Sequence, residues 1–262
     1  MGVTPVARQR RHSRPKRRRG RFGGLYKALS ILLAAAAVIV ACVVFFRVNS
    51  VEVTGNVRYT AQEVIEASGI KMGDNLVGLS RGRVSAAIRT QLPYVESVAV
   101  QKVLPDGVVL KVTERVASAS VDSAEGRWLM SSQGKLLEKD DGSIRAIQIA
   151  GLTATGPYAG GMIQVAEEEG ATLGYVKGLL TALEEHGLIT QCTALDCSAV
   201  TYITLDYGIY RLKLPRDEDY DYYLLLTERA LASGTIPEGQ RGTLDLTVVK
   251  GKAYFRSEDW QP

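Results

Sequence analysis

The feature that most constrains this chain is an uncharged apolar run of 19 residues, at positions 28–46, which reads ALSILLAAAAVIVACVVFF. As a helix it would span roughly 28 Å at about 1.5 Å per residue, close to the thickness of the hydrocarbon core of a bilayer. Only Ser30 and Cys42 interrupt the run, so it lacks the polar face that most helices of soluble proteins carry. The run therefore predicts a single transmembrane helix.

The charges on the two sides of this run predict its orientation. Residues 1–27 hold no acidic residue and ten basic ones: Arg8, Arg10, Arg11, Arg14, Lys16, Arg17, Arg18, Arg19, Arg21 and Lys27. Cytoplasmic flanks of membrane helices are enriched in Lys and Arg, so we expect this tail in the cytoplasm, disordered and near anionic lipid. The 216 residues from Arg47 onward are then outside the cell membrane.

Clustered arginines also bind nucleic acid, but two observations argue against that partner here. No folded unit and no interleaved aromatic residues accompany the basic tail. The overall charge of +4 hides an asymmetry, because the rest of the chain carries 22 basic and 28 acidic residues, or −6. We expect no nucleic-acid partner.

Two other interpretations of the apolar run remain open. A cleaved signal peptide would have a small-x-small site followed by a polar start, whereas this run stays apolar through Phe46. A lipoprotein signal would place its modified cysteine at Cys42, after Ile39-Val40-Ala41, but VVFF follows in place of a polar linker. An uncleaved anchor fits these residues better than either alternative.

Residues 47–118 are predicted to form a compact β-α-α-β-β unit. Thr60 and Glu63 have the spacing of a capping box, so a helix should begin near Ala61, and Gly69 should end it. Ser80 can cap a second helix, which Pro93 closes. Alternating apolar residues predict strands at 48–53, 94–102 and 108–114, the last two joined by the turn 104–107.

Residues 119–256 are predicted to form a β-rich second domain, followed by a short tail at 257–262. Helical spacing of apolar residues predicts two helices, from Leu173 to Leu183 and from Tyr220 to Leu231. Strands are predicted at 128–130, 135–137, 144–149, 162–165, 189–198, 200–207, 209–214, 244–249 and 253–255. The fold class is α+β, with helices packed on one face of the first sheet.

The exterior residues do not assemble a recognisable catalytic or metal-binding set. His186 is the only exterior histidine, and its place in the last turn of a helix favours a structural role. Asp217, Asp219, Asp221 and Glu228 match part of a calcium-loop pattern, but Tyr222 occupies the position that needs glycine. These acids fit the N-terminus of an amphipathic helix better. We therefore expect no enzyme activity, no metal, no cofactor and no small-molecule substrate.

Cys192 and Cys197 could form a disulfide only in one of two conformations. If the segment between them is a strand, their Cα atoms lie about 16 Å apart on opposite faces. A disulfide tolerates about 4.4–6.8 Å, so pairing would require a turn at residues 193–196. The sequence leaves both conformations open.

Without a catalytic set, the exterior is more readily interpreted as a binding surface. An unpaired sheet edge is a template for strand addition by a partner. We expect this edge at residues 243–249, because this strand lies close to the C-terminus and could lack a neighbour on one side.

Several segments resemble one known family. Val51–Asn56, Leu92–Val100, Leu104–Asp106 and Val112–Arg115 are similar in order and spacing to the POTRA domain of FtsQ/DivIB, a bitopic bacterial cell-division family. Trp128–Met130 with Gly134–Leu137 resembles the first hairpin of the family's second domain. Two features depart from the family's pattern. Ala117 stands where a proline is frequent, and Ser131 or Ser132 replaces an acidic residue.

The resemblance implies a non-enzymatic scaffold at the division septum, with its POTRA unit in recruitment to that site. It implies binding of FtsL-like and DivIC/FtsB-like membrane proteins, and through them a link to septal peptidoglycan synthases. Strand pairing with a partner carries over by position to Thr243, Leu244, Asp245, Leu246, Thr247 and Tyr254. A Leu246→Pro substitution should then abolish strand addition, since proline donates no ladder hydrogen bond.

Two alternative functions belong to other classes. The acid-rich exterior could belong to a membrane-anchored hydrolase, which would need Asp217, Asp219, Asp221 or His186 in its active site. A POTRA-type export factor would usually bring a barrel or tandem POTRA repeats, and no repeat of 20–50 residues occurs here.

Overall fold

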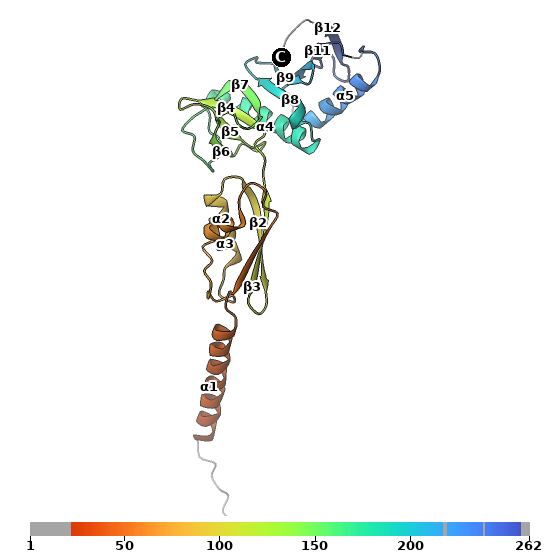
Figure 1. Ribbon diagram of the computed structural model, residues 1–262. Helices are drawn as coiled ribbons and strands as arrows, with labels where there is room; N and C mark the ends of the chain where they lie inside the picture. The colour runs from red at the N-terminus through yellow and green to blue at the C-terminus, as the bar shows by residue number, and fades with distance from the viewer. Residues whose placement is uncertain (1–21, 217–218, 238, 258–262) are drawn as a thin grey trace, which may run out of the picture.

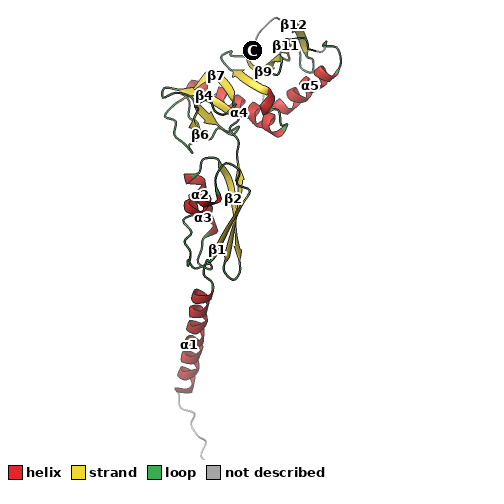
Figure 2. Ribbon diagram, viewed as in Figure 1, coloured by secondary structure: helices red, strands yellow, loops and turns green. Residues whose placement is uncertain are grey.

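The computed structural model describes residues 22–216, 219–237 and 239–257. The tail predicted at the N-terminus lies largely outside these residues, as do Asp217 and residues 258–262. The described chain forms an N-terminal helix, a small α/β unit and a larger β-rich unit, in that order (Figures 1 and 2). We call the unit built from β1 to β3 the proximal unit and the one built from β4 to β12 the distal unit.

The N-terminal helix α1 (Phe22–Phe45) is apolar and stands apart from both units (Figure 1). Its stretch Gly23–Cys42 has a mean hydropathy of 2.2 and none of it is buried inside the protein. Twenty helical residues span about 30 Å, the thickness of a hydrocarbon core. The helix predicted at 28–46 is therefore confirmed, although it begins six residues earlier, and its exposed apolar surface fits a membrane span.

The proximal unit has the predicted β-α-α-β-β order. Its elements are β1 (Ser50–Thr54), α2 (Ala61–Ser68), α3 (Arg81–Gln91), β2 (Val95–Val103) and β3 (Gly107–Glu114). The sheet order is β1-β3-β2, with β1 parallel and β2 antiparallel to β3. The two helices pack on this sheet through a core of buried residues that includes Val64, Ile88 and Leu110.

The capping box at α2 shows how local sequence determines this unit. Thr60 Oγ1 accepts a hydrogen bond from the backbone N–H of Glu63 at 3.3 Å, and Glu63 Oε2 accepts one from the N–H of Thr60 at 2.7 Å. The two bonds satisfy donors that the first turn of a helix leaves unpaired. Gly69 then ends α2 with a left-handed backbone, at φ of 69°. Both predicted ends of the helix are confirmed.

The distal unit is a nine-stranded mixed sheet with two α-helices and two short 3-10 turns. Its strands are β4 (Ala119–Ser123), β5 (Trp128–Met130), β6 (Leu136–Lys139), β7 (Ile147–Ala154), β8 (Cys192–Asp196), β9 (Tyr202–Tyr207), β10 (Tyr210–Pro215), β11 (Gly242–Asp245) and β12 (Tyr254–Ser257). Its helices are α4 (Gly170–Glu185) and α5 (Tyr220–Ala232), and its 3-10 turns are η1 (Glu167–Glu169) and η2 (Ile189–Gln191). The sheet order is β12-β11-β10-β9-β8-β7-β4-β5-β6.

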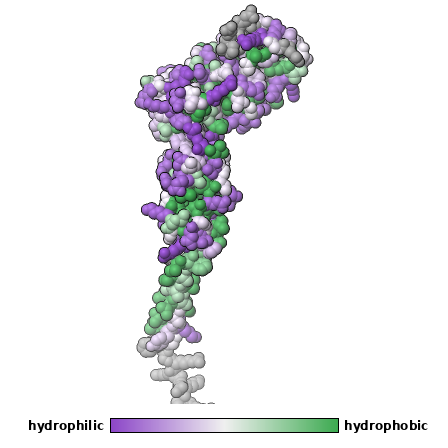
Figure 3. Space-filling model, in the orientation of Figure 1, coloured by the Kyte–Doolittle hydropathy of each residue, from purple (hydrophilic) through white to green (hydrophobic). Residues whose placement is uncertain are grey.

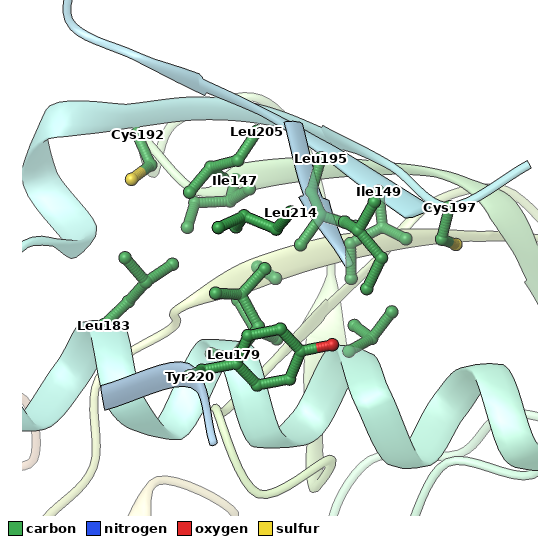
Figure 4. Packing of buried hydrophobic residues seen from close by; sticks show 14 of the residues in the cluster. Ile147, Ile149, Leu179, Leu183, Cys192, Leu195, Cys197, Leu205, Leu214 and Tyr220 are labelled. Atoms are coloured by element: carbon green, nitrogen blue, oxygen red, sulfur yellow. The ribbon is translucent and has the colours of Figure 1, made fainter. Parts of the chain in front are cut away.

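One strand predicted for the distal unit is wrong, although the α+β class is confirmed. Residues 162–165 form no strand, and Met162 makes only an isolated bridge with Lys135. The core forms where α4 packs against the sheet. In Figure 4, Leu179 and Leu183 of α4 lie against strand residues such as Ile147, and all three are buried.

Cys192 and Cys197 are both free and buried. Residues 192–196 form strand β8, so the extended alternative holds and the turn required by a disulfide is absent. The Cys192 thiol lies 3.5 Å from the carbonyl oxygen of Leu188, and the Cys197 thiol lies 3.1 Å from that of Ala150. The two cysteines serve as small apolar residues of the core (Figure 4).

We expect both thiols to be unreactive in the folded protein at neutral pH. Burial raises the pKa of Cys192 to about 12 and the pKa of Cys197 to about 11. Only the thiolate attacks a disulfide reagent, and a raised pKa keeps the thiol protonated until the pH nears that value. Titration of a Cys42→Ala variant should show two reactive thiols in denaturant and close to none in native buffer. Fast labelling of the native protein would contradict the burial.

Candidate partner-binding edge

The sheet of the distal unit ends at β12, the last strand that the structure describes. β11 lies between two neighbours: it pairs in parallel with β10 and antiparallel with β12. The prediction of an unpaired edge at residues 243–249 is therefore wrong for β11. Among the described residues, β12 has a partner on one side only and is an exposed edge of the sheet. The opposite edge is β6, where the backbone of Leu136 bonds to Gly160 and Gly161.

The predicted partner-binding residues fall into two groups. Leu244 is 1% exposed and Leu246 is 2% exposed, and both belong to the hydrophobic core. Thr243, Asp245 and Thr247 are half-buried, whereas Tyr254 on β12 is 43% exposed. Of these six residues, Tyr254 alone lies on the edge strand β12. Contact of all six with a partner stays a prediction.

Leu246 also has a structural role, which changes what the Leu246→Pro substitution would test. Its N–H donates to the carbonyl oxygen of Lys213 on β10, at 3.0 Å. Leu246→Pro would therefore break a bond inside the sheet and disturb the core. This substitution tests folding rather than strand addition.

Asp245 explains why β11 ends where it does. Its Oδ1 accepts hydrogen bonds from both the N–H and the hydroxyl of Thr247, at 2.9 and 2.6 Å, and its Oδ2 lies 3.3 Å from Lys213 Nζ. Burial alone would raise the pKa of Asp245, but these partners lower it below its ordinary value. A side chain that binds the backbone two residues ahead closes a turn, so the chain leaves the sheet once the N–H of Leu246 has bonded to β10.

The edge is bordered by apolar and basic side chains. Val248 is 60% exposed and Val249 is 42% exposed, in the segment that leads to β12. Three exposed basic residues lie in the same stretch: Lys250, Lys252 and Arg256. Phe255 instead packs toward the core, with its ring 6.4 Å from that of Tyr210. Such an edge suits an extended segment that carries apolar and acidic side chains.

A second set of contacts joins the distal unit to the proximal unit. Glu138 Oε1, next to the end of β6, accepts hydrogen bonds from the hydroxyl of Tyr94 and from Arg58 Nη2, each at 2.6 Å. The guanidinium of Arg58 also stacks on the Tyr94 ring, 4.0 Å from its centroid. Beneath these polar contacts, Tyr94 packs with Leu129 and Leu137 of the distal unit. We call Arg58, Tyr94 and Glu138 the junction triad.

The acidic residues before and within α5 serve the helix. Asp219 is its N-cap, and Asp219 Oδ1 accepts a hydrogen bond from the N–H of Tyr222 at 3.1 Å. Asp221 lies in the first turn, where its Oδ1 is 3.1 Å from Nε2 of His186 at the end of α4. The helical interpretation is confirmed, and His186 connects two helices. In the described ranges, no group of three or more His, Cys, Asp and Glu side chains could hold a metal ion.

Among the described residues, these features define a class of protein: one apolar N-terminal helix, then a small β-α-α-β-β unit, then a β-rich unit with an exposed sheet edge. The family model for the POTRA domain of FtsQ type matches residues 46–115, which includes the proximal unit. This match confirms the POTRA resemblance seen in the sequence.

Curated relatives extend the likeness beyond that domain. The chain is 29% identical over 121 residues to the cell division protein FtsQ of Corynebacterium glutamicum, covering 46% of this chain and 54% of that protein. It is 37% identical over 117 residues to FtsQ of Streptomyces coelicolor, covering 42% and 44%. It is 24% identical over 242 residues to the cell division protein DivIB of Clostridium botulinum strain Loch Maree, covering 92% and 93%.

Together these matches show that the chain contains a POTRA domain of FtsQ type and is similar to cell-division proteins named FtsQ and DivIB. For three of these relatives, the aligned part spans 54%, 66% and 44% of their own length, less than two thirds of each protein. Their role in division is therefore carried to this chain only as a proposal.

Proposed function

We propose that this protein is a non-enzymatic membrane scaffold of the bacterial division machinery. The observation that carries the proposal is an FtsQ-type POTRA domain that follows directly on a helix long and apolar enough to span a membrane. The ten basic residues before and at the start of that helix support a cytoplasmic N-terminus. Both folded units would then be exterior, with boundaries at 47–118 and 119–256, and the protein would concentrate at the septum.

The partners we propose are FtsL-like and DivIC/FtsB-like membrane proteins, which would link this protein to septal peptidoglycan synthases. An extended segment of such a partner would add to β12 as a further strand. Three observations support this mode: the exposed edge at β12, the exposed Val248, Val249 and Tyr254, and the basic Lys250, Lys252 and Arg256. Main-chain bonds would give affinity, and the apolar and charged side chains would give specificity.

A localisation and depletion experiment tests the proposed function. A fluorescent fusion to the N-terminus should concentrate at mid-cell, and depletion of the protein should produce filamentous cells that fail to divide. The wild-type gene should restore division, and a chain that lacks residues 46–115 should not. A uniform membrane signal together with normal division after depletion would reject the scaffold.

A further inference from the structure

The end of the proximal unit next to α1 carries exposed apolar side chains. Val103 and Leu104, at the tip of the β2–β3 hairpin, are 50% and 65% exposed. Met72 and Val77, in the connection between α2 and α3, are 65% and 59% exposed. Figure 1 shows both loops at the end of the unit that adjoins α1, and Figure 3 shows hydrophobic surface continuing from the helix onto this end. We call these four residues the proximal foot.

No flexible spacer separates the foot from the membrane helix. The N–H of Phe46 still donates to the carbonyl oxygen of Cys42 at 3.1 Å, and the carbonyl oxygen of Phe46 accepts from the N–H of Leu76 at 2.9 Å. Two residues on, Val48 exchanges backbone bonds with Asp74 at 2.9 Å and with Gly73 at 2.8 Å. The connection that carries Met72 and Val77 is therefore bonded to the chain as soon as it leaves α1.

The tip of the β2–β3 hairpin is held beside the α2–α3 connection. Lys102 Nζ donates to the carbonyl oxygen of Val77 at 3.0 Å, which ties the tip to the α2–α3 connection. Asn49 binds Asp106 twice, through its N–H at 2.9 Å and its side-chain amide at 3.1 Å. The four apolar side chains thus come from two loops that are joined to each other and to the end of the span.

We propose that the proximal foot inserts into the membrane–water interface on the exterior face of the bilayer that α1 spans, so that lipid covers it. The inference rests on α1 spanning the membrane, as in the proposed function. The uncharged run that spans roughly 28 Å of hydrocarbon ends at Phe46, next to Arg47, so Phe46 lies at the boundary between the hydrocarbon core and the headgroups. Gly73 and Leu76, the neighbours of Met72 and Val77, are hydrogen-bonded to Val48 and Phe46 at that level. Apolar side chains at this depth gain by leaving water.

The charges around the foot suit an anionic lipid surface. Arg47 and Lys71 are exposed at this end of the unit. Among the carboxylates beside them, Asp74 Oδ2 accepts from the N–H of Lys71 at 2.9 Å and Asp106 is held by Asn49. Exposed cations at headgroup height attract anionic lipid. The foot would give the exterior units a defined tilt on the bilayer, which α1 alone cannot provide.

The test measures the depth of single labels in the full-length protein, in vesicles of phosphatidylglycerol and phosphatidylethanolamine. A polarity-sensitive fluorophore is attached to Met72→Cys or Leu104→Cys in a Cys42→Ala background. The matched control is Val57→Cys, which is 91% exposed in the same unit but lies at the far end of β1 from the membrane. Nitroxide lipid should quench the labels at 72 and 104 at least about twofold more than the label at 57.

Vesicle flotation separates failure of this inference from failure of the proposed span. If the protein floats with the vesicles and all three labels are quenched equally, the foot does not enter the interface and the inference is wrong. The inference would also be overturned if the labels at 72 and 104 reported an apolar environment only after a partner protein was added, because a protein would then cover the foot. A chain that does not float contradicts the membrane span itself.

Discussion

Replacing Gly242 with alanine is expected to weaken partner binding by more than about tenfold, which corresponds to at least about 1.4 kcal/mol of binding free energy. Gly242 opens β11 opposite Ser257 of β12. A Cβ atom there would collide with the carbonyl oxygen of Arg256 and the ring of Phe255, and its nearest neighbours are all in these two residues of β12. The edge strand must then move away, and the proposed template for strand addition is lost.

The control for this substitution is Gly174→Ala in α4. A Cβ atom at Gly174 meets no atom within 4 Å, and alanine in a helix is more stable than glycine by up to about 1 kcal/mol. Titration of full-length protein with an FtsL-like or DivIC/FtsB-like partner should therefore show wild-type affinity for Gly174→Ala. Limited trypsin digestion should cut Gly242→Ala faster at Lys250, Lys252 and Arg256. Faster cutting with unchanged affinity would remove β12 from the interface.

The local parts of this fold could be predicted from the sequence because their causes are local. The ends of α2 follow from Thr60, Glu63 and Gly69, all within nine residues of one another. The apolar run that forms α1 needs no tertiary context, since its composition alone distinguishes it from the helices of the two folded units.

The position of the sheet edge could not be predicted in the same way. Thr247, Val248 and Val249 are β-formers by composition, but Asp245 binds Thr247 and turns the chain away from the sheet there. The order of the strands is also non-local, because β11 returns across α5 to pair in parallel with β10. The sequence pattern therefore predicted a strand here correctly, but it could not show that β11 lies between β10 and β12. Nothing in the sequence distinguishes the exposed Val248 and Val249 from the valines of a buried strand.

The junction triad could not be predicted from the sequence either. Arg58 and Glu138 are 80 residues apart, and both belong to charge patterns that are usual on a solvated surface. Only the packing of Tyr94 against Leu129 and Leu137 brings them together. The triad links the proximal unit to the distal unit, which carries the proposed edge.

Replacing Glu138 with alanine is expected to loosen the two units relative to each other. The side chains of Arg58 and Glu138 are each 40% exposed, so their ion pair contributes only about 0–1 kcal/mol. Tyr94 is 5% exposed as a residue, and the substitution removes the acceptor of its part-buried hydroxyl, at a cost of about 1–3 kcal/mol. Tyr94→Phe should cost less, because the remaining Glu138 carboxylate still pairs with Arg58. Thermal unfolding of the three proteins checks this order.

High pH should loosen the junction as well, by ionising the same hydroxyl. Burial, followed by the hydrogen bond to Glu138, raises the pKa of Tyr94 above its ordinary value. A raised pKa means that the contribution of Tyr94 to stability is present in full below about pH 10, the unfolded value, and is lost as the pH rises through the folded value. The junction should therefore stay closed at physiological pH and open only in strongly alkaline solution.

The decisive measurement is the distribution of distances between spin labels on the two units, at Leu104→Cys and Val200→Cys in the Cys42→Ala background. Both sites are exposed, at 65% and 83%. The wild-type junction should give one narrow distribution, and Glu138→Ala should broaden it. Glu125→Ala is the matched control, because its 3.8 Å ion pair with Lys139 is exposed and lies within the distal unit. Equal widths for Glu138→Ala and Glu125→Ala would mean that apolar packing around Tyr94 holds the units together, without help from the polar triad.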